Sequence, residues 1–388
     1  MRPFVVIAVA VAVATSGCRR DRSLSTTDGG STTSEAGPSA SARSTTSALA
    51  ELTLARACVP GLAFAAITRE GESVGATGLS HIATKLEATS DTVFEAASIA
   101  KLVVTTCVMQ LVDEGKLDLD ADAGKYVGFA IRHPRWPERI TLRMLLTHRA
   151  SIRDIDAELA ARAAGNPLGS FLKTYLVRDD APRAAAFLDD HPGSKLTYSN
   201  VGAALAALAV EHVSGEGFVS FSTRRVFAPL RMTKTSWARS EQAPYAFATP
   251  HAYRNGAFVA LQPPSHAVYP AVDLLAPAGD LARFARAILR DGELDGARIL
   301  SASRVREMLR GDPHQGGQAL GWQVRTIGER HVVGHEGEDA GATTGLFLDL
   351  AAGTGAVVLA NGDAFGSGDQ ARAAAIQTMI SELLATRR

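Results

Sequence analysis

Cysteine and lysine are scarce in this 388-residue sequence: it has three cysteines and seven lysines, and its 40 basic residues are balanced by 40 acidic ones. Three cysteines cannot form a disulfide framework, and the sequence contains no Cys/His spacing of the zinc-binding type, so no metal site is expected. The net charge of zero argues against a nucleic-acid partner, because neutralising phosphates requires a basic face. What the sequence does have is 46% hydrophobic residues, enough for one large domain or two ordinary ones.

The N-terminal 18 residues have the features of an export signal. A short basic start, Met1-Arg2-Pro3, precedes an apolar run over 4–14 and then small residues before Cys18. The apolar run is about half as long as a membrane-spanning helix, which disfavours a permanent transmembrane anchor. The segment before Cys18 resembles a lipoprotein cleavage box, so Cys18 is either a lipid attachment site or part of a discarded secretory signal. Palmitate incorporation that disappears in a Cys18→Ala variant would distinguish the two.

Residues 19–50 are expected to form a disordered tether, and residues 51–388 a folded domain. The first segment is rich in Ser, Thr, Ala and Gly and has almost no large apolar side chains, a composition that cannot repay the entropy of ordering. An exported protein with such a tether is expected in the periplasm or cell envelope, with membrane attachment if Cys18 is lipidated.

The folded body begins and ends with strand-like runs and has a mainly helical middle. Apolar runs bounded by turn residues predict strands at 62–68, 73–78, 343–350 and 355–360. Apolar positions at helical spacing predict helices at 98–114, 141–148, 157–164, 201–213, 218–226 and 369–386. This order indicates an α+β fold in which an antiparallel sheet is flanked by helices and a mainly helical domain is inserted.

A candidate nucleophile lies at the start of the helix predicted over 98–114. Ser98 and Lys101 form a Ser-x-x-Lys motif, and residues three apart share a helix face, so the amine can reach the hydroxyl. The helix N-terminus also offers N–H groups to a developing oxyanion. Chance alone gives about 0.5 such matches in this sequence. A second match, Ser170 and Lys173, lies within an amphipathic helical stretch and is interpreted as an ordinary helix.

Two further motifs follow in a consistent order. Tyr198 and Asn200 form a Tyr-x-Asn motif before an apolar helix, and chance predicts only about 0.06 such matches. The similar Tyr253-Arg254-Asn255 precedes Gly256 and is interpreted as a hairpin turn. A His-x-Gly motif at His335 and Gly337 precedes the last strand pair and is selected by its position in the chain.

Ser-x-x-Lys, Tyr-x-Asn and Lys/His-x-Gly in this order resemble the signature of the penicillin-recognising serine hydrolases, in particular their branch of class C β-lactamases, DD-peptidases and esterases. The resemblance covers roughly residues 60–363. Further stretches that are similar to family landmarks include Val59-Pro60-Gly61, Leu145-Leu146-Thr147-His148, Leu230-Arg231-Met232-Thr233 and Leu320-Gly321-Trp322.

The resemblance implies a β-lactamase/transpeptidase-like fold and an acyl-enzyme mechanism without metal or organic cofactor. Ser98 would be the nucleophile, and Lys101 and Tyr198 would transfer protons. Asn200 would bind the acyl side of a small-molecule or peptidoglycan-derived substrate, and the N–H groups of Ser98 and Glu338 would form the oxyanion hole. An alternative function is a penicillin-binding receptor that acylates but deacylates slowly, or a DD-carboxypeptidase.

The sequence departs from the family pattern at the third motif. His335-Glu336-Gly337 stands where β-lactamases have Lys-Thr-Gly, which removes a cation from the region that binds a substrate carboxylate. We therefore expect an ester or amide without that carboxylate to be cleaved more efficiently than a β-lactam. Arg149 is either a replacement cation or, by the preferred interpretation, a solvated arginine beside a helix-terminal His148.

Two other hydrolase classes are disfavoured. The one Gly-x-Ser-x-Gly match, Gly71 to Gly75, falls on a predicted hairpin turn and not on the strand-to-helix turn of an α/β-hydrolase. His335-Glu336 lacks the second histidine of a metalloprotease motif. Whether Cys58 and Cys107 pair in an exported body is left open by the sequence.

Overall fold

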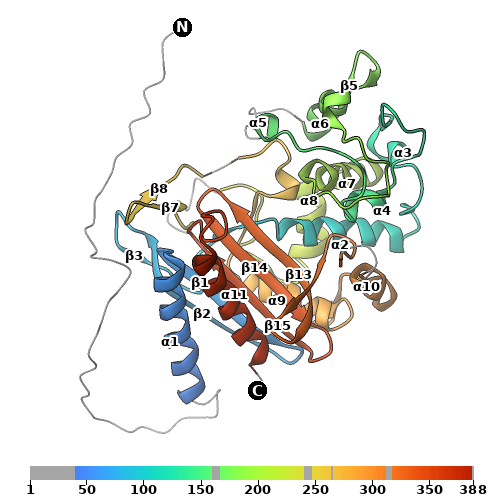
Figure 1. The fold of residues 1–388 in the computed structure, drawn as a ribbon. Coiled ribbons are helices and arrows are strands. Elements are labelled where there is room, and N and C mark those ends of the chain that lie inside the picture. The colour runs from blue at the N-terminus through green and yellow to red at the C-terminus, as the bar shows by residue number, and fades with distance from the viewer. Residues whose placement is uncertain (1–39, 160–166, 240–246, 264, 312–316, 387–388) are drawn as a thin grey trace, which may run out of the picture.

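The computed structural model describes residues 40–159, 167–239, 247–263, 265–311 and 317–386. Its centre is a seven-stranded antiparallel sheet with the strand order β12-β13-β14-β15-β1-β2-β3 (Figure 1). The sheet combines strands from distant parts of the sequence, because the early hairpin β1–β2 is joined to the late strands through the pairing of β1 with β15. The strands are β1 (Gly61–Thr68), β2 (Glu72–His81), β3 (Leu86–Glu87), β12 (Gln323–Ile327), β13 (Arg330–Asp339), β14 (Ala342–Asp349) and β15 (Thr354–Ala360).

Helices cover both faces of this sheet. Helix α11 (Gln370–Ala385) packs on β15 beside α1 (Ala40–Ala57), and α9 (Ala278–Leu289) contacts β1 and β15 from the opposite face (Figure 1). Asn361, just after β15, ties the sheet together: its Oδ1 accepts a hydrogen bond from Gly61 N at 2.9 Å, and its Nδ2 donates to Leu79, Ser80 and Thr249 carbonyls.

Helix α1 corrects the expected domain boundary. The segment 19–50 was predicted to be a tether, but α1 begins at Ala40 and continues through that boundary. The alanines of this segment favour a helix, and Leu49, Ala50 and Leu54 bury part of their surface in the cluster under α11. The folded domain therefore begins before residue 51. The predicted export signal, Cys18 and tether residues 19–39 lie outside the described residues.

The inserted section between β4 (Phe94–Ala97) and β7 (His251–Arg254) is mainly helical, as predicted. Helix α2 (Ala100–Asp113) is buried from Ala100 to Val112 and packs against α7 (Asn200–Ser214), so the two helices form a rigid centre. The other helices described in this section are α3 (Gly124–Val127), α4 (Leu142–Leu146), α5 (Asp156–Leu159), α6 (Leu168–Leu176), the 3-10 turn Ala184–Ala186, α8 (Phe218–Ser222) and the π-helical turn Thr223–Phe227.

Short elements complete the fold. The remaining strands pair as β5 (Val177–Arg178) with β6 (Ala181–Pro182), β7 with β8 (Ala257–Ala260), β4 with β9 (Leu274–Ala276), and β10 (Glu293–Leu294) with β11 (Ala297–Arg298). The described residues also include a 3-10 turn at Tyr269–Ala271 and helix α10 (Ala302–Leu309). The predicted α+β arrangement is confirmed, although the helix expected over 157–164 is described only to Leu159.

Candidate active site

Ser98 lies in the turn between strand β4 and helix α2. The preceding residue, Ala97, has a φ of 49°, a left-handed conformation that is unusual for a residue with a Cβ. This turn places Ser98 at the head of α2, where its side chain borders a cavity while 93% of the residue surface is covered. The strained turn and the fully buried helix behind it together fix the direction of the hydroxyl.

Lys101 reaches Ser98 from one turn further along α2. Its Nζ lies 3.0 Å from Ser98 Oγ and 2.8 Å from both Asn200 Oδ1 and the Ala271 carbonyl oxygen. The side chain is almost completely buried, and this burial lowers the pKa of Lys101 to about 7. A neutral amine has two N–H groups, which the two carbonyl oxygens satisfy, and its lone pair is then free to accept the Ser98 proton.

Tyr198 contacts the same hydroxyl from the other side. Its OH lies 2.8 Å from Ser98 Oγ, and Lys101 Nζ lies 4.8 Å from the centre of its ring. His148 packs against the ring with the centroids 4.5 Å apart, and its Nδ1 accepts a hydrogen bond from Ser199 N. Burial and the charge of Lys101 lower the pKa of His148 to about 3, so this imidazole is neutral and positions Tyr198.

Asp154, which the sequence analysis did not single out, holds the second motif in place. Its carboxylate accepts hydrogen bonds from Ser199 Oγ at 2.8 Å, Asn200 N at 2.6 Å and Val201 N at 3.2 Å. These donors form the N-terminus of α7, where a negative charge is stabilising. Asp154 therefore fixes the start of the helix that carries Asn200. Its only sequence signal was an acidic residue in a loop, which is common.

The third motif lies on the part of β13 that borders the cavity. Strand β12 pairs with β13 only as far as Gly334, so residues 335–339 form an open sheet edge on that side. His335 is buried, and this burial, with the nearby Lys101 charge, lowers its pKa well below the usual value. A Cβ at Gly337 would come within 2.1 Å of Thr344 Oγ1 and 2.7 Å of the Ala96 carbonyl oxygen. Glycine thus permits β13 to approach the strand that leads to Ser98.

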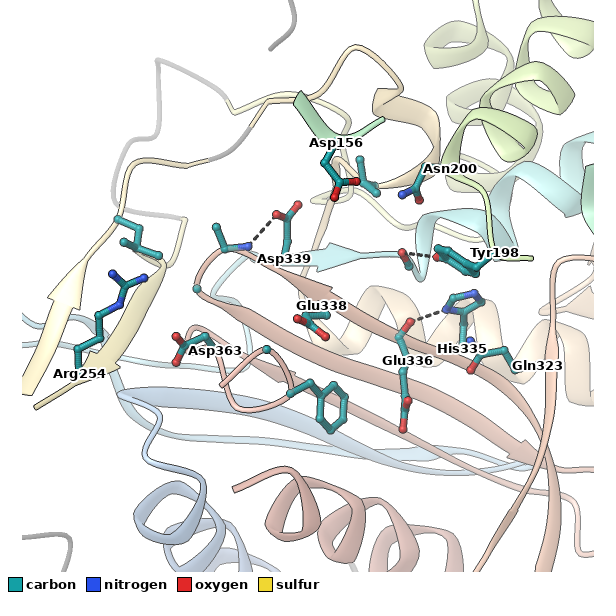
Figure 2. Close-up of a pocket in the computed structure, with 17 residues that line it drawn as sticks. Asp156, Tyr198, Asn200, Arg254, Gln323, His335, Glu336, Glu338, Asp339 and Asp363 are labelled. Carbon is teal, nitrogen blue, oxygen red and sulfur yellow. Dashed lines mark hydrogen bonds between the residues drawn. The ribbon is translucent and has the colours of Figure 1, made fainter. Parts of the chain in front are cut away.

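Glu336 lies on the other side of β13 from His335. Its carboxylate forms an ion pair with Arg325 at 2.5 Å and accepts a hydrogen bond from Gln377 of α11. Figure 2 shows it directed away from Tyr198 and His335, as the two-residue period of a strand requires. The substitution in the third motif therefore removes a cation beside Tyr198 and adds no carboxylate there.

These residues meet in a cavity of about 730 Å³ (Figure 2). Ser98, Tyr198, Asn200 and His335 line it together with Glu336 and Glu338, while Lys101 lies beneath Ser98. The structure thus brings together residues separated by about a hundred positions or more in the sequence. No group of three or more potential metal ligands lies close enough to hold an ion among the residues described.

Other candidates from the sequence lie elsewhere. Ser170 and Lys173 are in helix α6, and Asn255 is in the β7–β8 turn, as interpreted. Arg149 is buried, and its guanidinium donates to the Ser194 carbonyl, so the interpretation as a solvated arginine is wrong. Cys58 and Cys107 are both buried and do not pair with each other.

Residues 48–378 match the β-lactamase family. The chain belongs to the β-lactamase family. This family membership confirms the resemblance stated from the three motifs and the β-lactamase/transpeptidase-like fold. Within the family, the chain is 28% identical over 319 residues to penicillin-binding protein 4 of Amycolatopsis lactamdurans, covering 78% of this chain and 81% of that protein. It is 24% identical over 287 residues to the flp protein of Staphylococcus aureus N315, covering 73% of this chain but only 56% of that protein.

Solved structures of β-lactamase-fold proteins share the architecture. The octameric penicillin-binding protein homologue from Pyrococcus abyssi superposes with a TM-score of 0.74 at 21% identity, covering 89% of this chain and 78% of that one. D-amino acid amidase from Ochrobactrum anthropi SV3 superposes with a TM-score of 0.70 at 20% identity, covering 89% and 99%. In the described ranges, no helix combines the length and apolarity that crossing a membrane requires.

Proposed function

We propose that the protein is a serine hydrolase that cleaves an ester or amide through an acyl-enzyme on Ser98. The observation that carries this proposal is the contact of Ser98 Oγ with both Lys101 Nζ, at 3.0 Å, and Tyr198 OH, at 2.8 Å. A serine hydroxyl is a weak nucleophile until a neighbouring base accepts its proton. Two proton-transfer groups on one hydroxyl are a sufficient arrangement for that activation.

The reaction begins when neutral Lys101 takes the Ser98 proton as Oγ attacks the substrate carbonyl carbon. The carbonyl oxygen becomes an oxyanion, stabilised by the N–H groups of Ser98 and Glu338, each of which contributes about 3 kcal/mol in such sites. The carbon–leaving group bond then breaks, and Tyr198 passes the proton from Lys101 to the departing amine or alcohol. Water repeats the same steps on the acyl-enzyme, with Tyr198 and Lys101 receiving its proton, and Ser98 regains its hydrogen.

The choice of substrate follows from His335. A neutral imidazole replaces the cation that would bind a substrate carboxylate beside Tyr198, and Arg149 donates to a backbone carbonyl instead of facing the cavity. The similarity to a D-amino acid amidase supports an amide or ester without that carboxylate. We expect short-chain aryl esters to be hydrolysed faster than nitrocefin or a D-Ala-D-Ala peptide. The opposite order would refute this assignment of substrate.

A slow-deacylating penicillin receptor is the second candidate function, favoured by the similarity to penicillin-binding protein 4. A fluorescent penicillin would then remain bound for hours, and no ester or amide would turn over. Turnover of any ester or amide would instead support the hydrolase.

Replacing Asp154 by alanine should reduce activity as well as stability. The N-terminus of α7 would lose three hydrogen bonds to a carboxylate, costing about 2 kcal/mol of stability. Displacement of Tyr198 and Asn200 should lower the rate of Ser98 acylation by a fluorophosphonate about a hundredfold. The control is Asp369→Ala, because Asp369 caps α11 by accepting hydrogen bonds from Ala371 N and Arg372 N and is not among the residues that line the cavity. If both variants acylate at the wild-type rate, Asp154 has only a structural role.

A further inference from the structure

The open edge of β13 is surrounded by carboxylates. The cavity beside it is lined by five acidic residues, contributed by strand β13 and by the segments on either side of it: Asp156, Glu336, Glu338, Asp339 and Asp363. The only basic side chain among the described lining residues is Arg254, which comes from the β7–β8 hairpin at the outer end of the cavity (Figure 2). A substrate extended along this edge therefore meets an excess of negative charge.

Ion pairs neutralise only part of this charge. Glu336 pairs with Arg325 at 2.5 Å, and Asp363 pairs with Arg372 at 2.9 Å. Asp339 lies 3.6 Å from His266, which is held more closely by Asp273 at 2.6 Å.

Two of the five carboxylates are not neutralised by an ion pair. Asp156 and Glu338 have no ion pair within the described part of the chain. Burial raises the pKa values of Glu338 and Asp339, and repulsion from Asp339 adds to the rise at Glu338. A bound cation would relieve this repulsion.

The opposite part of the cavity is uncharged. His335 is 99% buried, lines the cavity, and its Nε2 has no hydrogen-bond partner among the described residues. Gln323 and Tyr198 lie beside it (Figure 2). An unsatisfied buried nitrogen facing a cavity indicates a ligand that supplies its partner. The cavity thus has a neutral, hydrogen-bonding part near His335 and an acidic part.

The acidic part lies on the side of Asn200. In Figure 2, Asp156 and Asp339 point into the cavity near Asn200, and Tyr198 and His335 lie further along the strand. The family resemblance assigns Asn200 to the acyl side of the substrate, and the proposed reaction assigns the N–H of Glu338 to the oxyanion. The Asp339 carboxylate therefore lies beyond the oxyanion site, toward the acyl group, whereas the Glu338 side chain shares the Glu336 face of β13 and lies beside Gly366.

We propose that the acyl part of the substrate carries a cationic group, an amine or a guanidinium, that binds at the acidic edge formed by Asp339 of β13 and by Asp156 opposite it. This inference rests on the proposed hydrolase function and names its substrate class. The neutral part of the cavity then receives an uncharged leaving group. A carboxylate on the acyl group is disfavoured by repulsion.

Three p-nitrophenyl esters with acyl chains of equal length test the proposal. The chains end in trimethylammonium, in its neutral isostere tert-butyl, or in carboxylate, and none of these can cyclise onto the ester as a free amine would. We expect kcat/KM to fall in the order cation, neutral, anion, with at least about a tenfold preference for the cation over the neutral ester. Equal rates for the three esters would overturn the inference and leave the hydrolase function intact. Absence of turnover and of fluorophosphonate labelling would instead refute the hydrolase function.

Variants locate the site. Asp339→Asn and Asp156→Asn should each reduce the cation-to-neutral ratio of kcat/KM about threefold or more, since each removes one charge from the edge. The ratio is independent of the fraction of folded enzyme, so a loss of stability does not imitate the effect. Glu382→Gln, an exposed carboxylate on α11, is the matched control and should leave the ratio unchanged. A cation preference that persists in both edge variants would show that the cation binds elsewhere.

Discussion

Replacing Ser98 by alanine is expected to abolish hydrolysis and covalent labelling. The substitution removes the atom to which the acyl group would be attached, so a fluorophosphonate or penicillin probe has no acceptor. Residual catalysis by the oxyanion donors alone is several orders of magnitude weaker, and we expect kcat to fall at least about a thousandfold. The measurement is in-gel fluorescence of the labelled protein, together with the initial rate on the best ester.

Ser170→Ala is the matched control for this experiment. Ser170 belongs to the other Ser-x-x-Lys sequence, but it lies in α6, outside the cavity. This variant should label and turn over like the wild type. Label that persists in Ser98→Ala would overturn the site, and label lost only in Ser170→Ala would move it to α6.

The second large effect is expected at Lys101. Because burial lowers the pKa of this amine to about 7, it is half neutral near pH 7 and can act as a base. The acylation rate should therefore rise as the pH increases through about 7 and level off above it. Lys101→Met removes the base, so it should reduce kcat/KM about 100- to 10,000-fold on the plateau above pH 7 and abolish this limb. Lys173→Met in α6 is the control.

The same pKa predicts a stability effect of known sign. The ordinary pKa of lysine is 10.5, whereas that of folded Lys101 is about 7, so between these pH values the unfolded chain binds more protons at this residue. This contribution to the free energy of unfolding therefore rises with pH over that range and is lost as the pH falls toward 7. Denaturant unfolding of the wild type and of Lys101→Met as a function of pH should show this rise in the wild type alone.

For the acylation prediction, a rate independent of pH from 6 to 8 would contradict the role of Lys101 as a base.

Local spacing made half of the candidate site predictable. Ser98 and Lys101 are one helical turn apart, so their contact follows from periodicity, and the strands 62–68 and 355–360 follow from apolar runs. Contacts that depend on the path of a loop could not be predicted from local spacing. The Ala271 carbonyl that holds Lys101 comes from an irregular turn, and a backbone oxygen has no sequence signature.

Side-chain direction was predictable only once the strand register was known. The sequence placed His335 and Glu336 in one motif, but a strand sends neighbours to opposite faces, which turned Glu336 to Arg325. The early start of α1 was not predicted, because the alanines and serines of this segment resemble a linker in composition. The helix is held by its packing on α11, which is distant in sequence, and on β2 and β1.

Strand β1 has one neighbour close in sequence and another far away. Its residue Gly61 bonds to Asn361, 300 positions later, and the rest of the strand pairs with β15. During synthesis, the first hairpin therefore cannot pair with the rest of the sheet until β15 has been made, some 300 residues later. Such non-local pairing makes folding slow and leaves an unpaired edge exposed in the meantime. We thus expect slow refolding after dilution from denaturant, and no stable fragment when the chain ends before β15.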